Sequence, residues 1–143
     1  TSTAANYLRF VQLLLDDGQL DGVRLLAPGS VHFMTQNRLA ADTANRLTTP
    51  DEIVDSPVYG VGRPDTASSF DAGLGVTLRP ANVVNALPGN AGEFSVAAPT
   101  GPYFWADRSD RLAVVMLAYV PDAPARLRLH RQLRALVHQA IED

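Results

Sequence analysis

The chain of 143 residues contains no cysteine and no lysine. Without cysteine it can form no disulfide, zinc–thiolate site or iron–sulfur cluster, and it has no thiol nucleophile. All twelve basic residues are arginine. Because arginine stays protonated in proteins, this chain by itself cannot use a lysine base or a lysine Schiff base. The sequence also shows no cofactor motif, since Gly60-Val61-Gly62 lacks the third glycine of a dinucleotide fingerprint.

Charge and long apolar runs are also scarce. Charged residues make up 19% of the chain and the net charge is −3, so we expect no nucleic-acid partner. The longest apolar run, Leu112–Val120, is too short to cross a bilayer as a helix. The chain starts at Thr1 without a methionine, which suggests a fragment, a processed chain or a trimmed tag. Its first residues also lack a signal-peptide pattern, and the localisation stays open. With 46% apolar residues, we expect one folded domain over residues 1–143.

Residues 1–39 have the pattern of helices. Ser2 or Thr3 can cap the first helix, and Gly18 lies just after its end. Asp21-Gly22 predicts a turn. Pro28 suits the first position of a second helix, which continues over Val31–Leu39 with Val31, Met34 and Leu39 facing inward. The apolar stripe of the first helix consists of Tyr7, Phe10, Val11, Leu14 and Leu15.

Residues 40–70 are rich in Thr, Asp, Pro, Gly and Ser, which predicts a loop-rich stretch. Residues 71–143 then have the pattern of a sheet with a closing helix. Leu112–Val120 has almost no polar member, so we expect a strand that is buried on both faces in the middle of a sheet. The fold class is therefore α+β, with about three to four antiparallel strands, N-terminal helices and a C-terminal helix packed on the sheet. The expected strands include the alternating Leu74, Val76 and Leu78, and then Phe94–Ala98, Tyr103–Asp107 and Leu112–Val120.

The closing helix carries an apolar stripe and a basic cluster. We expect the basic cluster to be a solvated face, with an anionic partner or a lipid surface as the alternative. His138 and Glu142 are spaced like two metal ligands, but they have no third partner, so we predict no metal site. The stripe consists of Leu129, Leu133, Leu136, Val137 and Ala140, and the cluster of Arg126, Arg128, Arg131 and Arg134 with His130.

Three consecutive aromatic residues, Tyr103, Phe104 and Trp105, occupy one expected strand. Tyr103 and Trp105 share one face of that strand and Phe104 takes the other. They form either a binding platform or part of the core under the closing helix, and burial statistics favour the core.

The order of these segments resembles the C-terminal part of the serine β-lactamase-like superfamily. This superfamily includes class C β-lactamases, esterases and D-aminopeptidases, with a penicillin-binding-protein-type fold. The stretch Thr3–Leu39 is similar to the late helical part of that family, and Gly73-Leu74-Gly75-Val76 to its first late strand. Pro88–Ser95 followed by Tyr103–Asp107 is similar to its next hairpin.

The resemblance implies that the catalytic residues lie outside this chain. The family's nucleophile belongs to a Ser-x-x-Lys motif, and a Tyr-x-Asn element handles a second proton. A chain without lysine cannot contain the first motif, and Tyr59-Gly60-Val61 lacks the asparagine of the second. The family's third element, Lys-Thr-Gly or Trp-Gly-Gly, corresponds to Val96-Ala97-Ala98 or to Pro99-Thr100-Gly101. The predicted pocket wall is therefore Ser95, Val96, Ala97, Ala98, Pro99, Thr100 and Gly101.

In this family the residue after that triplet donates a backbone N–H to the oxyanion hole. Here the corresponding residue is Pro99 or Pro102, depending on the register. Proline has no N–H, so both registers predict a weakened or absent oxyanion hole. Loss of one oxyanion donor typically costs about 10²–10³ in rate.

The resemblance implies half the sheet and one wall of an acyl-serine pocket in a metal-free hydrolase of small esters or amides. We expect the chain alone to be inactive. The edge of Leu112–Val120 should then pair with the upstream part of the same protein or with a second copy. The alternative is a free-standing, non-catalytic module derived from that fold, which would oligomerise or bind a ligand.

Overall fold

The computed structural model describes residues 2–38, 71–79 and 88–142. The predicted loop-rich stretch 40–70, Leu39 and Tyr59 lie outside the described residues. The elements are α1 (Ala4–Leu15), β1 (Gln19–Leu20), β2 (Val23–Arg24), α2 (Pro28–Met34), β3 (Asp71–Ala72), β4 (Thr77–Leu78), β5 (Phe94–Ala97), β6 (Tyr103–Asp107), β7 (Leu112–Met116) and α5 (Ala123–Glu142).

Helix α1 begins and ends where the sequence predicts. The Thr3 side chain accepts a hydrogen bond from the Asn6 N–H at 3.2 Å, which caps the first turn. After the helix, Gly18 has a positive φ of 88° and its N–H donates to the Leu13 carbonyl at 2.7 Å. The predicted stripe is confirmed at Val11 and Leu14, which are buried, whereas Phe10 is 42% exposed.

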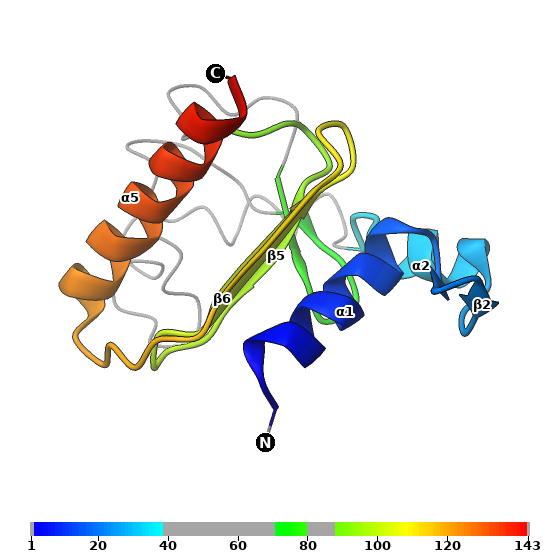
Figure 1. The fold of residues 1–143 in the computed structure, drawn as a ribbon, viewed down its shortest axis with the longest axis horizontal. Coiled ribbons are helices and arrows are strands. Elements are labelled where there is room, and N and C mark those ends of the chain that lie inside the picture. The colour runs from blue at the N-terminus through cyan, green and yellow to red at the C-terminus, as the bar shows by residue number, and fades with distance from the viewer. Residues whose placement is uncertain (1, 39–70, 80–87, 143) are drawn as a thin grey trace.

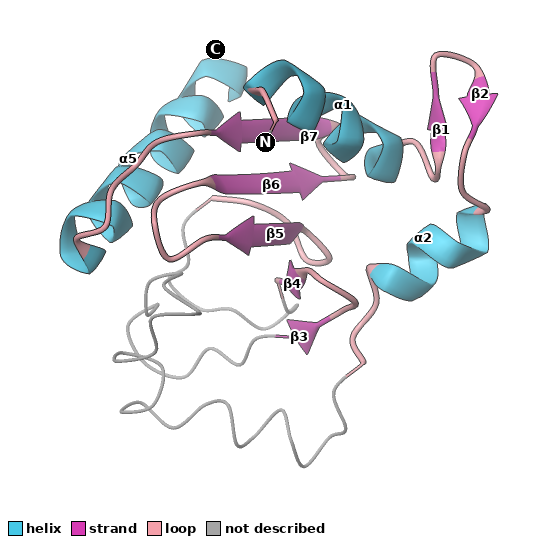
Figure 2. Cartoon of the chain, turned by 90° about the horizontal axis from the view of Figure 1, so that it is seen from below, coloured by secondary structure: helices cyan, strands magenta, loops and turns pink. Residues whose placement is uncertain are grey.

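The described strands form a five-stranded antiparallel sheet in the order β3-β4-β5-β6-β7, together with a two-stranded ribbon of β1 and β2 (Figure 2). The α+β class is confirmed, and the sheet contains more strands than expected. The strand predicted over Leu74–Leu78 is wrong in its first half, because residues 73–76 form a turn between β3 and β4. Gly75 makes this turn possible with a φ of 77°.

Two helices cover opposite faces of the sheet (Figure 1). Side chains alternate along β6, so Phe104 and Ala106 join the apolar core with Val11 and Leu14 of α1. Tyr103, Trp105 and Asp107 point the other way. Tyr103 stacks on the ring of His130 of α5. The aromatic residues of β6 are therefore core residues on both sides, as burial statistics favoured.

The prediction for α5 is wrong about which face meets the sheet. Arg126, His130, Arg134 and His138 are all buried, while Leu136 of the predicted apolar stripe is 63% exposed. The physical reason is that the facing surface of the sheet is itself polar, as the contacts of Glu93 and Tyr103 with Arg134 show. The prediction of a solvated basic cluster is therefore wrong for Arg126, His130 and Arg134, whereas Arg128 and Arg131 are exposed as expected.

Strand β7 is shorter than the predicted strand and lies at one edge of the described sheet. It ends at Met116, and all five of its residues are half-buried. The sequence predicted burial on both faces in the middle of a sheet, and within the described residues that prediction is not met because β7 pairs only with β6. Among the described helices, none has the length and hydropathy needed to span a bilayer.

Candidate functional site at the end of the β5–β6 hairpin

The predicted pocket wall lies at the end of the hairpin formed by β5 and β6. Ser95–Ala97 belong to β5, and the remaining residues form the turn, which we call the hairpin tip (Ala98–Pro102). The Ala98 N–H donates to the Pro102 carbonyl at 2.8 Å, and the Gly101 N–H donates to the Ala98 carbonyl at 3.1 Å. Pro99 therefore occupies the second position of a β-turn, which its fixed φ favours. The structure brings all seven predicted wall residues together.

Gly101 is required at the tip. Its φ is 126°, and a Cβ at this position would lie 2.2 Å from the carbonyl oxygen of Ala118. The segment after β7 also holds the tip, because the Val120 N–H donates to the Thr100 carbonyl at 2.7 Å. Pro99 and Thr100 remain exposed while Gly101 is buried.

Ala97 has a backbone N–H and carbonyl on the side of β5 that β4 leaves open. The Ala98 N–H points toward β6, and the Glu93 carbonyl points toward β4, where it accepts from the Arg79 N–H. Successive peptide groups alternate along a strand, so the polar groups of Ala97 face the same side as those of Glu93. Within the described residues, however, β4 pairs with β5 only at Phe94 and Ser95. In the part of the chain that the structure describes, no strand therefore pairs with the N–H and carbonyl of Ala97 on this side of β5.

This geometry bears on the predicted loss of an oxyanion donor. Pro99 and Pro102 have no N–H, and the N–H groups of Ala98 and Gly101 are used within the turn. Ala97, one residue before the turn, is the β5 residue of the predicted wall whose N–H faces the β4 side beyond the described pairing with β4. Sequence spacing alone could not identify it, because the direction of a peptide group depends on the register of strand pairing.

A polar interface lies beneath the tip, between the sheet and α5. The guanidinium of Arg134 binds both carboxylate oxygens of Glu93, at 2.5 and 2.6 Å. It also donates to the Tyr103 hydroxyl at 2.7 Å and to the Pro88 carbonyl at 3.0 Å, and it lies 4.6 Å from the centre of the Trp105 ring. Burial alone would lower the pKa of Arg134, but the hydrogen bonds and charges of Glu93 and Tyr103 outweigh it and raise the pKa. Arg134 therefore stays charged.

Burial raises the pKa of the Tyr103 hydroxyl, although the nearby Arg134 opposes this effect. His130 stacks on the same ring, with centroids 4.4 Å apart and the planes 14° from parallel. Burial lowers the pKa of His130. Sequence reasoning missed this interface, although one signal was available: Arg126, His130, Arg134 and His138 recur every four residues on one helix face.

The described residues include no group of three or more potential metal ligands. The Glu142 side chain of the weighed His138–Glu142 pair lies outside the described residues, and His138 is buried.

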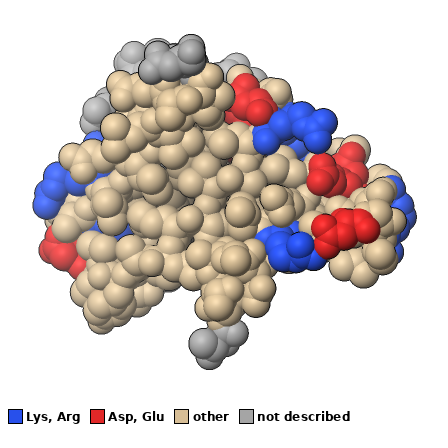
Figure 3. Space-filling view, in the orientation of Figure 1, with Lys and Arg blue, Asp and Glu red and all other residues tan. Residues whose placement is uncertain are grey.

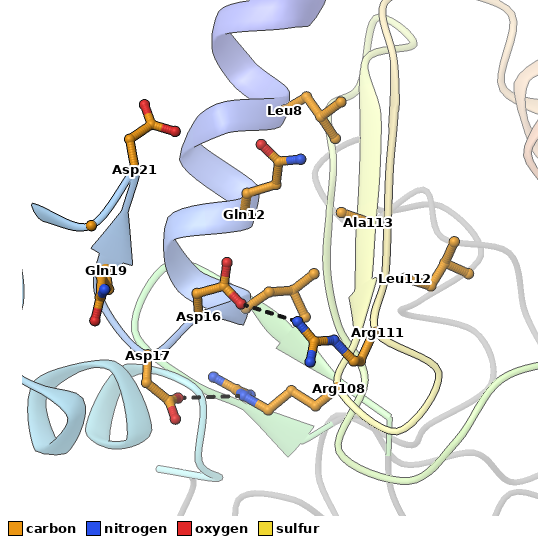
Figure 4. A pocket seen from close by; sticks show the side chains of 12 residues that line it. Leu8, Gln12, Asp16, Asp17, Gln19, Asp21, Arg108, Arg111, Leu112 and Ala113 are labelled. Carbon is orange, nitrogen blue, oxygen red and sulfur yellow. Dashed lines mark ion pairs between the residues drawn. The ribbon is translucent and has the colours of Figure 1, made fainter. Parts of the chain in front are cut away.

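A separate groove of about 910 Å³ lies at the opposite end of β6, between α1, the β1–β2 ribbon and β7 (Figure 4). Four of its charged residues pair with one another, Asp16 with Arg111 at 3.9 Å and Asp17 with Arg108 at 3.8 Å, while Asp21 pairs with Arg9 outside the groove. In the space-filling view, charged side chains gather toward this end and a large part of the remaining face is uncharged (Figure 3). The groove runs along the start of β7, at Leu112 and Ala113, and away from the predicted wall.

No protein-family model matches the chain. Two curated proteins of Mycobacterium tuberculosis, Protein Rv1367c and Uncharacterized protein MT1414, are each 36% identical to it over 123 residues. The matched stretch covers 85% of this chain and 28% of each relative. The chain therefore spans less than a third of the curated relatives it matches.

Solved structures match the fold over nearly the whole chain. Unliganded simvastatin synthase (LovD) from Aspergillus terreus has a TM-score of 0.69 at 19% identity, covering 96% of this chain and 34% of that one. The LovD9 mutant of the same enzyme has a TM-score of 0.73 at 21% identity, covering 99% and 36%. The resemblance in fold seen in the sequence is thus confirmed.

Proposed function

Because the chain has part of the serine β-lactamase/transpeptidase-like fold, we propose that it is the C-terminal part of a serine hydrolase of that fold. In this proposal it supplies half of the sheet and one wall of an acyl-serine pocket, Ser95–Gly101. The upstream part supplies the serine nucleophile and its lysine, which this chain lacks. The substrate is a small ester or amide, and no metal or cofactor takes part.

Two observations support the proposal: nearly the whole chain aligns with only about a third of the length of the solved structures it resembles, and, within the described residues, β7 pairs on one side only. A strand whose outer edge has no partner favours pairing with another segment. The upstream polypeptide is the occupant that also completes the fold. The apolar stripe of α5, with Leu136 63% exposed, offers that segment a second contact.

The open edge of β5 gives this wall a chemical role. An acyl-serine intermediate passes through a tetrahedral oxyanion, which backbone N–H groups stabilise. Ala97 can donate such a hydrogen bond, and its carbonyl can accept one from the amide of a substrate. The two prolines that follow cannot donate, but they fix the turn that holds Ala97 in place.

The test uses the longer polypeptide that carries an in-frame Ser-x-x-Lys, assayed with p-nitrophenyl butyrate and a chromogenic cephalosporin. Ala97→Pro removes only the outward N–H, because proline is tolerated at a strand edge. We expect kcat/KM to fall about 10²–10³-fold, whereas Ala97→Val, which keeps the N–H, should retain most activity. Equal losses in both variants, or turnover by the 143-residue chain alone, would contradict the proposal.

The alternative is a non-catalytic module whose β7 edge pairs with a second copy, and the prolines at 99 and 102 favour it. Native mass spectrometry of the purified chain separates the two. Species only at multiples of 15.4 kDa support the module. A complex with a different, upstream polypeptide supports the hydrolase.

A further inference from the structure

The hairpin tip is tied to α5 by one side chain. The Nε2 atom of His130 lies 3.0 Å from the carbonyl oxygen of Gly101, although the two residues are 29 positions apart. His130 is only 6% exposed. Among the described residues, no other side chain donates a hydrogen bond to the tip. The position of this turn therefore depends on the orientation of one imidazole ring.

The His130 ring is itself fixed by contacts that begin on the same hairpin. Glu93, just before β5, binds Arg134, and Arg134 donates to the Tyr103 hydroxyl at 2.7 Å. The Tyr103 ring stacks on His130, and His130 contacts Gly101. These contacts connect the base of the hairpin to its tip through side chains of α5. Each of the four side chains is 6% exposed or less.

The chemistry of the contact fixes the tautomer of His130. A carbonyl oxygen only accepts, so Nε2 must carry the hydrogen. Nδ1 is buried with no partner among the described residues, so a second proton there would be an unpaired buried donor. Two cations, Arg126 and Arg134, lie on the same helix face, Tyr103 faces the ring from β6, and Glu93 is already paired with Arg134. Burial accordingly lowers the pKa of His130, and the neutral Nε2–H form holds the turn.

Movement of Gly101 would be passed on to the wall. Its N–H donates to the Ala98 carbonyl, and Ala98 is the residue bonded to Ala97. The tip has little space to shift toward the segment after β7, because even a Cβ at Gly101 would lie 2.2 Å from the Ala118 carbonyl oxygen. We infer that His130 is a positioning residue of the pocket wall, whose bond to the Gly101 carbonyl fixes the tip and thereby aims the Ala97 peptide group. The role of the pocket wall in this inference rests on the proposed function, whereas the contact between His130 and Gly101 does not.

The first test measures amide hydrogen exchange in the 143-residue chain. His130→Phe keeps an aromatic ring for Tyr103 but removes the donor, and His130→Gln keeps an N–H donor at a similar distance from the backbone. With His130→Phe we expect protection of the Gly101 and Val120 amides to fall about tenfold, the value of one hydrogen bond. His130→Gln should lose less than about threefold by the same reasoning. The Ala106 amide, at the far end of β6, is the control and should be unchanged.

An equal loss of protection at the Ala106 amide would mean that His130 has a merely structural role. Unchanged protection at the Gly101 amide would mean that His130 does not hold the tip. Either result overturns the inference. If His130→Phe does not fold, long-range ¹H–¹⁵N spectra of the unmodified chain decide instead. They should show the Nε2–H tautomer at neutral pH, and the Nδ1–H tautomer would refute the inference.

The second test uses the longer, catalytic polypeptide. His130→Phe should lower kcat by about tenfold, the value of one misplaced hydrogen bond, with little change in KM, and His130→Gln should restore most of kcat. If neither the unmodified polypeptide nor its variants hydrolyse an ester, the proposed function is refuted. Amide hydrogen exchange alone then tests the contact between His130 and Gly101. An active polypeptide in which His130→Phe keeps full kcat would refute the positioning role alone.

Discussion

Replacing Arg134 with methionine should cost more stability than any exposed substitution on α5. The change removes four hydrogen bonds: two to Glu93 at 2.5 and 2.6 Å, one to Tyr103 at 2.7 Å and one to Pro88 at 3.0 Å. It also leaves Glu93, 5% exposed, without its counter-charge. Breaking a buried pair on one side typically costs about 3–5 kcal/mol, a large share of the roughly 5–15 kcal/mol that stabilises a small domain.

Urea unfolding followed by tryptophan fluorescence measures this loss directly. Trp105 is the single tryptophan, is fully buried and lies 4.6 Å from the Arg134 guanidinium. The matched control is Arg128→Met, the same substitution at an exposed position of the same helix, which should change the free energy of unfolding by less than about 0.5 kcal/mol.

The double variant Glu93→Met/Arg134→Met separates the cost of leaving the Glu93 charge unpaired from the cost of the lost packing. With neither charge present, much of the loss should be recovered, because apolar replacements of a buried ion pair are often close to neutral. A loss below about 1 kcal/mol in Arg134→Met would refute the reasoning, since that is the range of exposed ion pairs. So would a double variant as unstable as the single one. If Arg134→Met has no folded baseline, Glu93→Gln provides the same comparison with a smaller change in shape.

Two further predictions concern stability. Because burial lowers the pKa of His130 below its ordinary 6.5, the unfolded chain takes up that proton first as the pH falls. Stability should therefore decrease as the pH drops through 6.5 toward the folded pKa, by at most about 1.4 kcal/mol per pH unit; His130→Gln should lack this component, and superimposable curves for the two proteins would contradict it. Gly101→Ala should lose about 2–4 kcal/mol through strain and overlap with Ala118, against about 1 kcal/mol for Gly22→Ala, where φ is also positive but the space is open. Equal losses in urea unfolding would show that the close approach is unimportant.

Much of the fold could be predicted because its local patterns and its packing agree. The capping residue Thr3 and the stripe through Val11 and Leu14 specify α1. Alternation along Tyr103–Asp107 specifies which residues of β6 face each helix. The turn at residues 73–76 was misread because Leu74 and Val76 alternate like strand residues, while the chain reverses at the intervening Gly75.

The orientation of α5 could not be predicted by the same reasoning. An apolar stripe predicts the buried face only when the opposing surface is apolar, and here that surface presents Glu93 and Tyr103. The location of the wall followed from a resemblance in segment order. The direction of the Ala97 peptide group and the contact between His130 and Gly101 depend on strand register and on residues far apart in the sequence, so no local pattern could reveal them.

The strand order β3-β4-β5-β6-β7 has a consequence for how the chain folds. Every strand pairs with the next one in sequence, so the sheet can grow hairpin by hairpin through contacts of short sequence separation, which form quickly. Helix α1 is the exception, since it packs on β6 and β7 from the other end of the chain, and its docking must first close a long loop. The meander and its closing helix should therefore set the folding rate, while substitutions in α1, such as Leu14→Ala, should act mainly by speeding unfolding.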